Sequence, residues 1–126
     1  MPRSEKELND LIRKIQDEFE ALWKAGDAKK LADLYHPEAV LVCTSAWVAY
    51  GRKAIEEKYV PLVGPNFNFK LIFDQNLEAG DGEYLIHKGR FAMEDKPGVF
   101  LPYEQIFKRQ SDGSYLIYHD EFSLGN

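Results

Sequence analysis

The start of the chain alternates apolar and polar residues with the period of an α-helix. Ser4 and Glu7 have the capping-box spacing, in which each side chain bonds an unpaired backbone N–H at a helix start. Apolar residues then recur at three- and four-residue steps, at Leu8, Leu11, Ile12, Ile15, Phe19, Leu22 and Trp23. Because mainly Lys, Asp, Glu and Gln occupy the opposite face, we expect a long amphipathic helix that ends at Gly26.

Two shorter helices and two short strands are expected next. Asp27 can cap a second helix, and Pro37 is expected to stop it because proline interrupts a helix. This helix would carry Leu31, Leu34 and Tyr35. Residues 39–43 and 46–50 form apolar pieces typical of buried strands. A third helix is expected from residue 52, with Ile55, Tyr59 and Leu62 on one face and an end near Pro61.

After residue 65 the apolar period changes from helical to two. Phe67, Phe69, Leu71 and Phe73 alternate with more polar positions, which indicates a strand with one face in the core. We expect strands at 67–79, 84–93, 99–108 and 115–122, joined by short turns rich in Gly and Asp. Helices first and strands afterwards favour a single α+β domain over residues 1–126, with the helices packed on an antiparallel sheet.

Composition narrows the classes of partner. The 126 residues include 16 Lys and Arg against 21 Asp and Glu, and the basic residues are scattered, so nucleic acid is not an expected partner. The longest apolar run, 39–43, is far below the roughly 20 residues that cross a bilayer, and the charged start is no signal peptide. With one cysteine, Cys43, we expect a cytoplasmic protein without membrane contact.

No motif points to a cofactor or a metal. The sequence contains no glycine-rich phosphate loop and no Gly-x-Ser-x-Gly nucleophile motif. Its three histidines lack the close spacing of a metal site. We therefore expect no cofactor and no bound metal.

The order of several weak motifs resembles the nuclear transport factor 2-like superfamily, and within it the SnoaL-like domains of unknown function. The motifs are the corner at Gly26 and Asp27, the segments 31–40 and 51–55, and the last hairpin at 111–120. The resemblance covers nearly the whole chain. It implies a cone of helices on a strongly curved sheet that opens at one end into a pocket. The superfamily includes ketosteroid isomerases, scytalone dehydratases, polyketide cyclases and a kinase association domain.

The last strand supplies the predicted catalytic pair. Regular alternation would place Tyr115, Ile117, His119 and Glu121 on one face, and Leu116, Tyr118, Asp120 and Phe122 on the other. A histidine beside a carboxylate in an apolar pocket could titrate near neutral pH and act as a general acid or base. His119 and Glu121 are therefore our catalytic candidates. The alternative is a structural hydrogen bond at the open end of the sheet.

Seven residues are predicted to bind a ligand. Aromatic side chains with polar tips are common in pockets, and such a cone would gather several from different elements. The candidates are Trp47, Tyr50, Tyr59, Phe69, His87, Tyr103 and Gln105. Tyr103 and Gln105 share one strand face, whereas alternation leaves the direction of His87 open.

Two functions remain open from the sequence, and it does not decide whether the chain is an enzyme. The first is a small-molecule-binding domain whose hydrophobic pocket supports cofactor-free isomerase, dehydratase or cyclase chemistry through the His/Glu pair. The second is a non-enzymatic homodimerisation or association module with an inert cavity. The resemblance implies a homodimer formed through the outer sheet face. Tyr118 and Phe122, expected on that face, would then need a partner.

Overall fold

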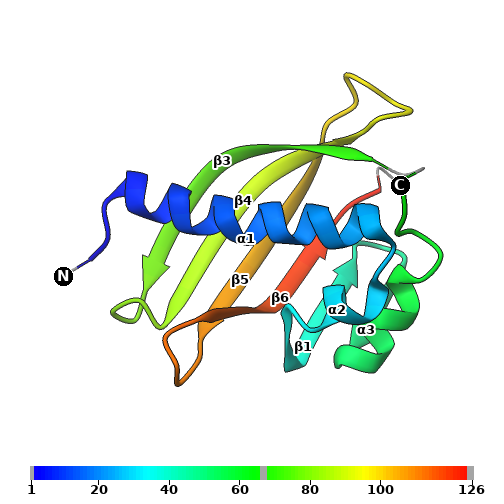
Figure 1. Cartoon of the computed structure of the whole chain (residues 1–126). Coiled ribbons are helices and arrows are strands. Elements are labelled where there is room, and N and C mark those ends of the chain that lie inside the picture. The colour runs from blue at the N-terminus through cyan, green and yellow to red at the C-terminus, as the bar shows by residue number, and fades with distance from the viewer. Residues whose placement is uncertain (1, 66–67, 125–126) are drawn as a thin grey trace.

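The computed structural model describes residues 2–65 and 68–124 and consists of three helices on one six-stranded sheet. The helices are α1 (Glu5–Ala25), α2 (Ala28–Ala32) and α3 (Arg52–Tyr59). The strands are β1 (Tyr35–Cys43), β2 (Trp47–Tyr50), β3 (Phe69–Ala79), β4 (Tyr84–Met93), β5 (Leu101–Arg109) and β6 (Tyr115–Phe122). The helix α1 crosses the long strands β3 to β6 (Figure 1). The expected α+β fold, with the helices on a strongly curved sheet, is confirmed.

The sheet is mixed and not wholly antiparallel. Its order is β2-β1-β6-β5-β4-β3. All neighbours are antiparallel except β1 and β6, which are parallel. The predicted meander of four long strands is thus confirmed, but the purely antiparallel sheet is wrong. Parallel neighbours require a long crossover connection, and the chain between β1 and β6 supplies it.

The helix boundaries agree with the sequence signals except after α2. The side chain of Ser4 accepts a hydrogen bond from the backbone N–H of Glu7 and Glu7 reciprocates, while Gly26 ends α1 with φ +74°. The predicted extension of α2 through Tyr35 is wrong, because the helix stops at Ala32 and β1 already begins at Tyr35. Pro37 lies inside β1, and its ring disfavours the helical conformation for the residue before it.

The long strands lie close to their predicted positions, although the start of the strand expected at Phe67 lies outside the described residues. Two of these strands contain β-bulges. On β6, His119 pairs with Ile106 and Ile117 pairs with Phe107, so Tyr118 is left without a partner on β5. On β3, the register likewise shifts between Phe73 and Gln75. A bulge adds one residue to a strand and therefore reverses which of the following side chains face inward.

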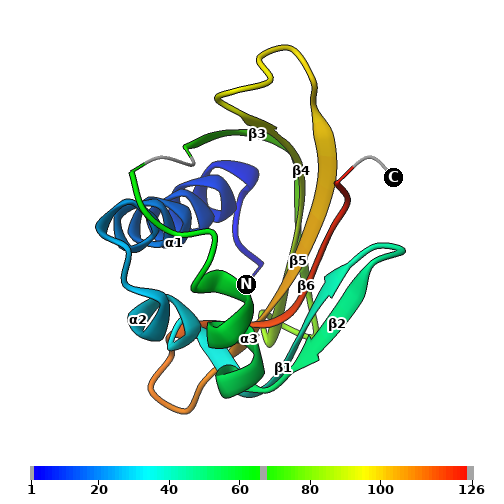
Figure 2. The ribbon, with the colours of Figure 1, turned by 90° about the vertical axis from the view of Figure 1, so that its right-hand side faces the viewer.

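The core lies between α1 and the concave side of the sheet. Figure 2 shows the sheet curving around α1, with α2 and α3 below that helix. The buried stripe of α1 contains Leu8, Ile12, Phe19 and Trp23, and also the polar Gln16. The sheet contributes fully buried Leu85, Phe107 and Ile117.

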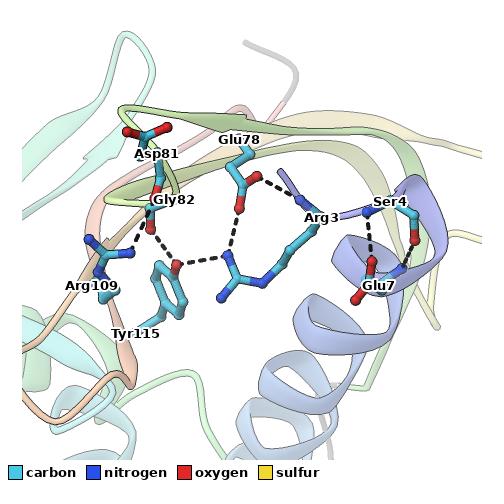
Figure 3. A network of polar contacts seen from close by, with 8 residues as sticks. All are labelled: Arg3, Ser4, Glu7, Glu78, Asp81, Gly82, Arg109 and Tyr115. Atoms are coloured by element: carbon cyan, nitrogen blue, oxygen red, sulfur yellow. Dashed lines mark hydrogen bonds and ion pairs between the residues drawn. The ribbon is translucent and has the colours of Figure 1, made fainter. Parts of the chain in front are cut away.

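The N-terminal segment is fastened to one end of the sheet (Figure 3). The guanidinium of Arg3 lies 2.6 Å from Glu78 and donates to the Tyr115 hydroxyl at 3.1 Å. That hydroxyl donates in turn to the backbone carbonyl of Gly82. These contacts join the segment before α1 to the end of β3 and the start of β6. In the described part of the chain, no helix has the length and apolar character needed to cross a membrane.

Candidate functional site

A cavity of about 400 Å³ lies at the other end of α1, against the concave face of the sheet. Five of the seven predicted ligand-binding residues line it: Trp47, Tyr59, Phe69, Tyr103 and Gln105. Phe19, Trp23, Phe91 and Phe122 complete its aromatic wall. The cavity reaches the surface beside exposed Lys58 and Leu124, and its volume is in the usual range for small-molecule pockets.

A buried carboxylate lies at the inner end of this cavity. Asp120 is 4% exposed, and its Oδ2 accepts hydrogen bonds from the hydroxyl of Tyr35 at 2.6 Å and from Nε2 of Gln105 at 3.0 Å. Gln105 accepts in turn from Nε2 of Gln16. Because the single proton of Tyr35 goes to Asp120, the Tyr59 hydroxyl must donate to Tyr35, at 2.6 Å.

Burial raises the pKa of Asp120 to about 6, although the hydrogen bonds from Tyr35 and Gln105 and the nearby His119 act in the opposite direction. Desolvation disfavours the charged carboxylate, and no ion pair to Asp120 occurs within the described residues to offset it. Such a group is mostly ionised at pH 7 and gains a proton readily. A poised carboxyl in an apolar pocket is suited to acid–base chemistry.

A second polar network lies behind Tyr103. His87 is fully buried, with Nδ1 2.6 Å from Oδ1 of Asn76 and Nε2 2.6 Å from the Tyr103 hydroxyl. Asn76 donates to Asn9 on α1 at 2.5 Å. Burial, followed by the charge of Arg13, lowers the pKa of His87 to about 4, so the imidazole is neutral at pH 7. His87 therefore faces inward but supports Tyr103 and does not line the cavity.

The predicted catalytic pair lies on the opposite face of the sheet. The bulge at Tyr118 reverses the alternation, so Asp120 and Phe122 point inward with Ile117, whereas His119 pairs with outward-facing Ile106. The prediction that Ile117 and His119 share one face of the sheet is therefore wrong. His119 Nε2 lies 3.6 Å from Glu121 Oε1 at a partly exposed position, and neither residue lines the cavity. We expected Phe122 to face outward, but because of the same bulge it faces inward and lines the cavity.

Tyr50 also lies away from the cavity. On β2 the residues alternate, with Ala49 buried and Tyr50 66% exposed. Among residues 2–65 and 68–124, no group of three or more His, Cys, Asp or Glu side chains is placed to hold a metal ion.

No family model matches the sequence, and no curated protein matches it at a significant level. Solved structures do match the fold. A nuclear transport factor 2-like protein with a cystatin-like fold from Novosphingobium aromaticivorans has a TM-score of 0.68 at 16% identity, covering 95% of this chain and 83% of its own. A ketosteroid isomerase-like protein from Erwinia carotovora atroseptica has a TM-score of 0.69 at 15% identity, covering 95% and 97%.

A third similar structure holds a small molecule. It is a protein from Catenulispora acidiphila in complex with S-DNPA, with a TM-score of 0.71 at 16% identity, covering 94% of this chain and 93% of its own. Together these matches show that the chain has a nuclear transport factor 2-like, cystatin-like fold. At such low identity they establish the fold and leave the function to the site.

Proposed function

We propose that this chain binds a small, mainly apolar molecule in the cavity and exchanges a proton with it through Asp120. The observation that carries this proposal is the position of one buried carboxylate at the inner end of an aromatic cavity of about 400 Å³. An apolar pocket with a few convergent polar groups is the common form of a small-molecule site. The complex of a protein with the same fold supports binding in general terms.

The chemistry available is acid–base catalysis without a cofactor, as in isomerisation, dehydration or cyclisation. An ionised Asp120 can take a proton from the bound molecule, and the donors Tyr35 and Gln105 hold the carboxylate in place. The raised pKa keeps the proton affinity of this carboxyl closer to neutral pH than that of an exposed aspartate. This assigns the proton-transfer step to Asp120 in place of the pair on the outer face.

A thermal-shift screen with flat apolar compounds tests the binding. We expect stabilising compounds for the wild type, because a ligand that binds only the folded state raises the melting temperature. The same compounds should lose their effect in Leu71→Trp, which fills the cavity from the β3 wall. Glu104→Gln, a conservative change on the outer face of β5, is the control and should keep it. An absence of any stabilising compound would contradict the proposal.

A further inference from the structure

The hydroxyl of Tyr103 has a fixed hydrogen-bond direction. Oδ1 of Asn76 is an acceptor, so the facing Nδ1 of His87 must carry the imidazole proton. The opposite nitrogen, Nε2, is then an acceptor, and the Tyr103 hydroxyl must donate to it. Asn76 is held in this orientation because its amide nitrogen donates to Asn9. The single proton of Tyr103 is thus used behind the cavity wall, and its oxygen can only accept from a bound molecule.

The carboxylate of Asp120 is restricted in the same way. Its Oδ2 receives both the Tyr35 and the Gln105 hydrogen bonds, and among the described residues none donates to Oδ1. Because Asp120 lines the cavity, Oδ1 is the atom left for a ligand. In the ionised state a carboxylate oxygen accepts and does not donate.

Tyr59 follows the same rule. Its proton goes to the Tyr35 hydroxyl, so its oxygen can only accept from any further partner. The oxygens of Tyr59, Tyr103 and Asp120 belong to residues that line the cavity from three separate elements, α3, β5 and β6. The cation Lys58 lies at the mouth over the ring of Trp47, with its Nζ 4.6 Å from the ring centroid, and not among these oxygens.

We infer that the molecule bound in this cavity presents a hydroxyl or N–H donor to Oδ1 of Asp120, and that a carbonyl group is disfavoured at that atom. The amides of Gln16 and Gln105 also line the cavity and each keep one N–H, which a carbonyl elsewhere in the molecule can meet. This inference rests on the proposed function, since it describes the ligand of the same cavity. At Asp120 a ligand carbonyl would meet an oxygen without an available proton, and an unpaired buried acceptor is costly. A ligand hydroxyl would instead pair with a buried carboxylate through a charge-assisted hydrogen bond.

Four naphthalene probes of similar shape test this inference: naphthalene, 2-naphthol, its methyl ether and 2-acetonaphthone. Binding to the whole chain would be measured by isothermal titration calorimetry at about pH 7.5. We expect 2-naphthol to bind about tenfold more tightly than the ether or the ketone, as one added hydrogen bond to a charged group implies. Equal affinity of the four probes, or preference for the ketone, would overturn the inference.

Asp120→Asn provides the sharper test. Its amide oxygen can keep the hydrogen bonds from Tyr35 and Gln105, which turns the amide nitrogen, a donor, toward the ligand. We expect the preference to invert, so that 2-acetonaphthone gains and 2-naphthol loses affinity. The control Glu104→Gln should keep the wild-type order. Circular dichroism spectra would confirm that Asp120→Asn is folded, and an unchanged order in the folded variant would refute the role of Asp120.

The results distinguish failure of the proposed ligand cavity from failure of the donor requirement at its inner end, which we call the donor rule. If no probe binds, naphthalene included, the proposed apolar site fails for this class of compound and the donor rule falls with it. If all four bind with equal affinity, and lose binding in Leu71→Trp, the cavity is a ligand site but the donor rule is wrong.

Discussion

At the scale of single residues, the site depends on which side chains are buried together. Asp120 and His87 are both removed from water, and burial moves their pKa values in opposite directions. The carboxyl faces the cavity, whereas the imidazole is held between Asn76 and Tyr103. One group is therefore available for proton exchange, and the other acts as a neutral support for a cavity residue.

We predict that the pKa of Asp120 is raised in the folded protein. A carboxyl-detected NMR titration should show Asp120 titrating near pH 6, well above an ordinary aspartate. Tyr35→Phe should raise this pKa further, because it removes a hydrogen bond that favours the ionised form. A titration of Asp120 in the ordinary range, near pH 4, would contradict the account.

At the scale of the elements, the placement of the cavity residues depends on close approach between neighbouring strands. Gly89 on β4 pairs with Tyr103 on the neighbouring strand β5. An added Cβ at this position would lie 2.5 Å from the carbonyl oxygen of Ile72 and 2.9 Å from Cε1 of Tyr103. Glycine is needed here for the approach of its neighbours, and not for an unusual backbone conformation.

Gly89→Ala should therefore destabilise the fold and displace Tyr103. We expect the free energy of unfolding to fall by about 1–3 kcal/mol, the usual cost of overpacking a core. Urea denaturation would measure it, with the exposed neighbour Lys88→Ala as the control. If both variants lose equally little stability, the close packing at Gly89 does not constrain the sheet.

The N-terminal segment is held to the sheet by the contacts of Arg3 with Glu78 and Tyr115. Tyr115→Phe removes the hydrogen bond to the Gly82 carbonyl and the one from Arg3, so it should lower the free energy of unfolding by about 1–2 kcal/mol. Urea denaturation would measure this loss. Isothermal titration calorimetry with 2-naphthol should show that the ligand affinity of the cavity is little changed in the folded variant, because the cavity lies at the opposite end of α1. A large loss of ligand affinity would show that the two ends are coupled.

At the scale of the whole molecule, the free energy of unfolding depends on pH through two buried titratable groups, His87 and Asp120. His87 has a pKa of about 4 in the fold against 6.5 ordinarily, so the unfolded chain binds more protons and stability falls as pH drops through this window. Asp120 has a pKa of about 6 against 3.8 ordinarily, so the folded chain binds more protons and stability rises as pH drops from about 6. In the wild type the two contributions largely offset each other.

Asp120→Asn should remove the contribution of Asp120 to the pH dependence of the unfolding free energy and leave that of His87. Between about pH 7 and pH 5 the variant should lose about 2 kcal/mol of unfolding free energy, while the wild type changes much less. Chemical denaturation at the two pH values would measure the difference, and Glu104→Gln should follow the wild type. If the unfolding free energies of Asp120→Asn and the wild type change equally with pH, Asp120 does not offset the contribution of His87.

The homodimer expected from the resemblance remains a prediction at this scale. Light scattering at micromolar concentration should report twice the 14.5 kDa mass if the outer sheet face pairs with a second copy. Ile106→Asp on that face should then give a monomer, because it places a charge in the contact. A wild-type monomer would contradict the expectation.

The periodicity, caps and turns of the sequence determined most of the elements and the α+β order, although the second helix was expected to run past Ala32. Local backbone chemistry at Ser4, Gly26 and the hairpin turns depends on nearby residues alone, and can therefore be predicted from sequence. Trp47, Tyr59, Phe69, Tyr103 and Gln105 were also identifiable as cavity residues, because aromatic and amide side chains on inward positions tend to gather in such a fold.

Only the tertiary structure decided which residues of the last strand line the cavity. The bulge at Tyr118 exchanges the faces of His119 and Asp120, and it is a property of the pairing between β5 and β6. One sequence signal was present, since apolar Ile117 and Phe122 are five residues apart, which strict alternation does not allow on one face. The donors that hold Asp120 come from β1 and β5, and contacts between segments this far apart in sequence form only when the chain folds.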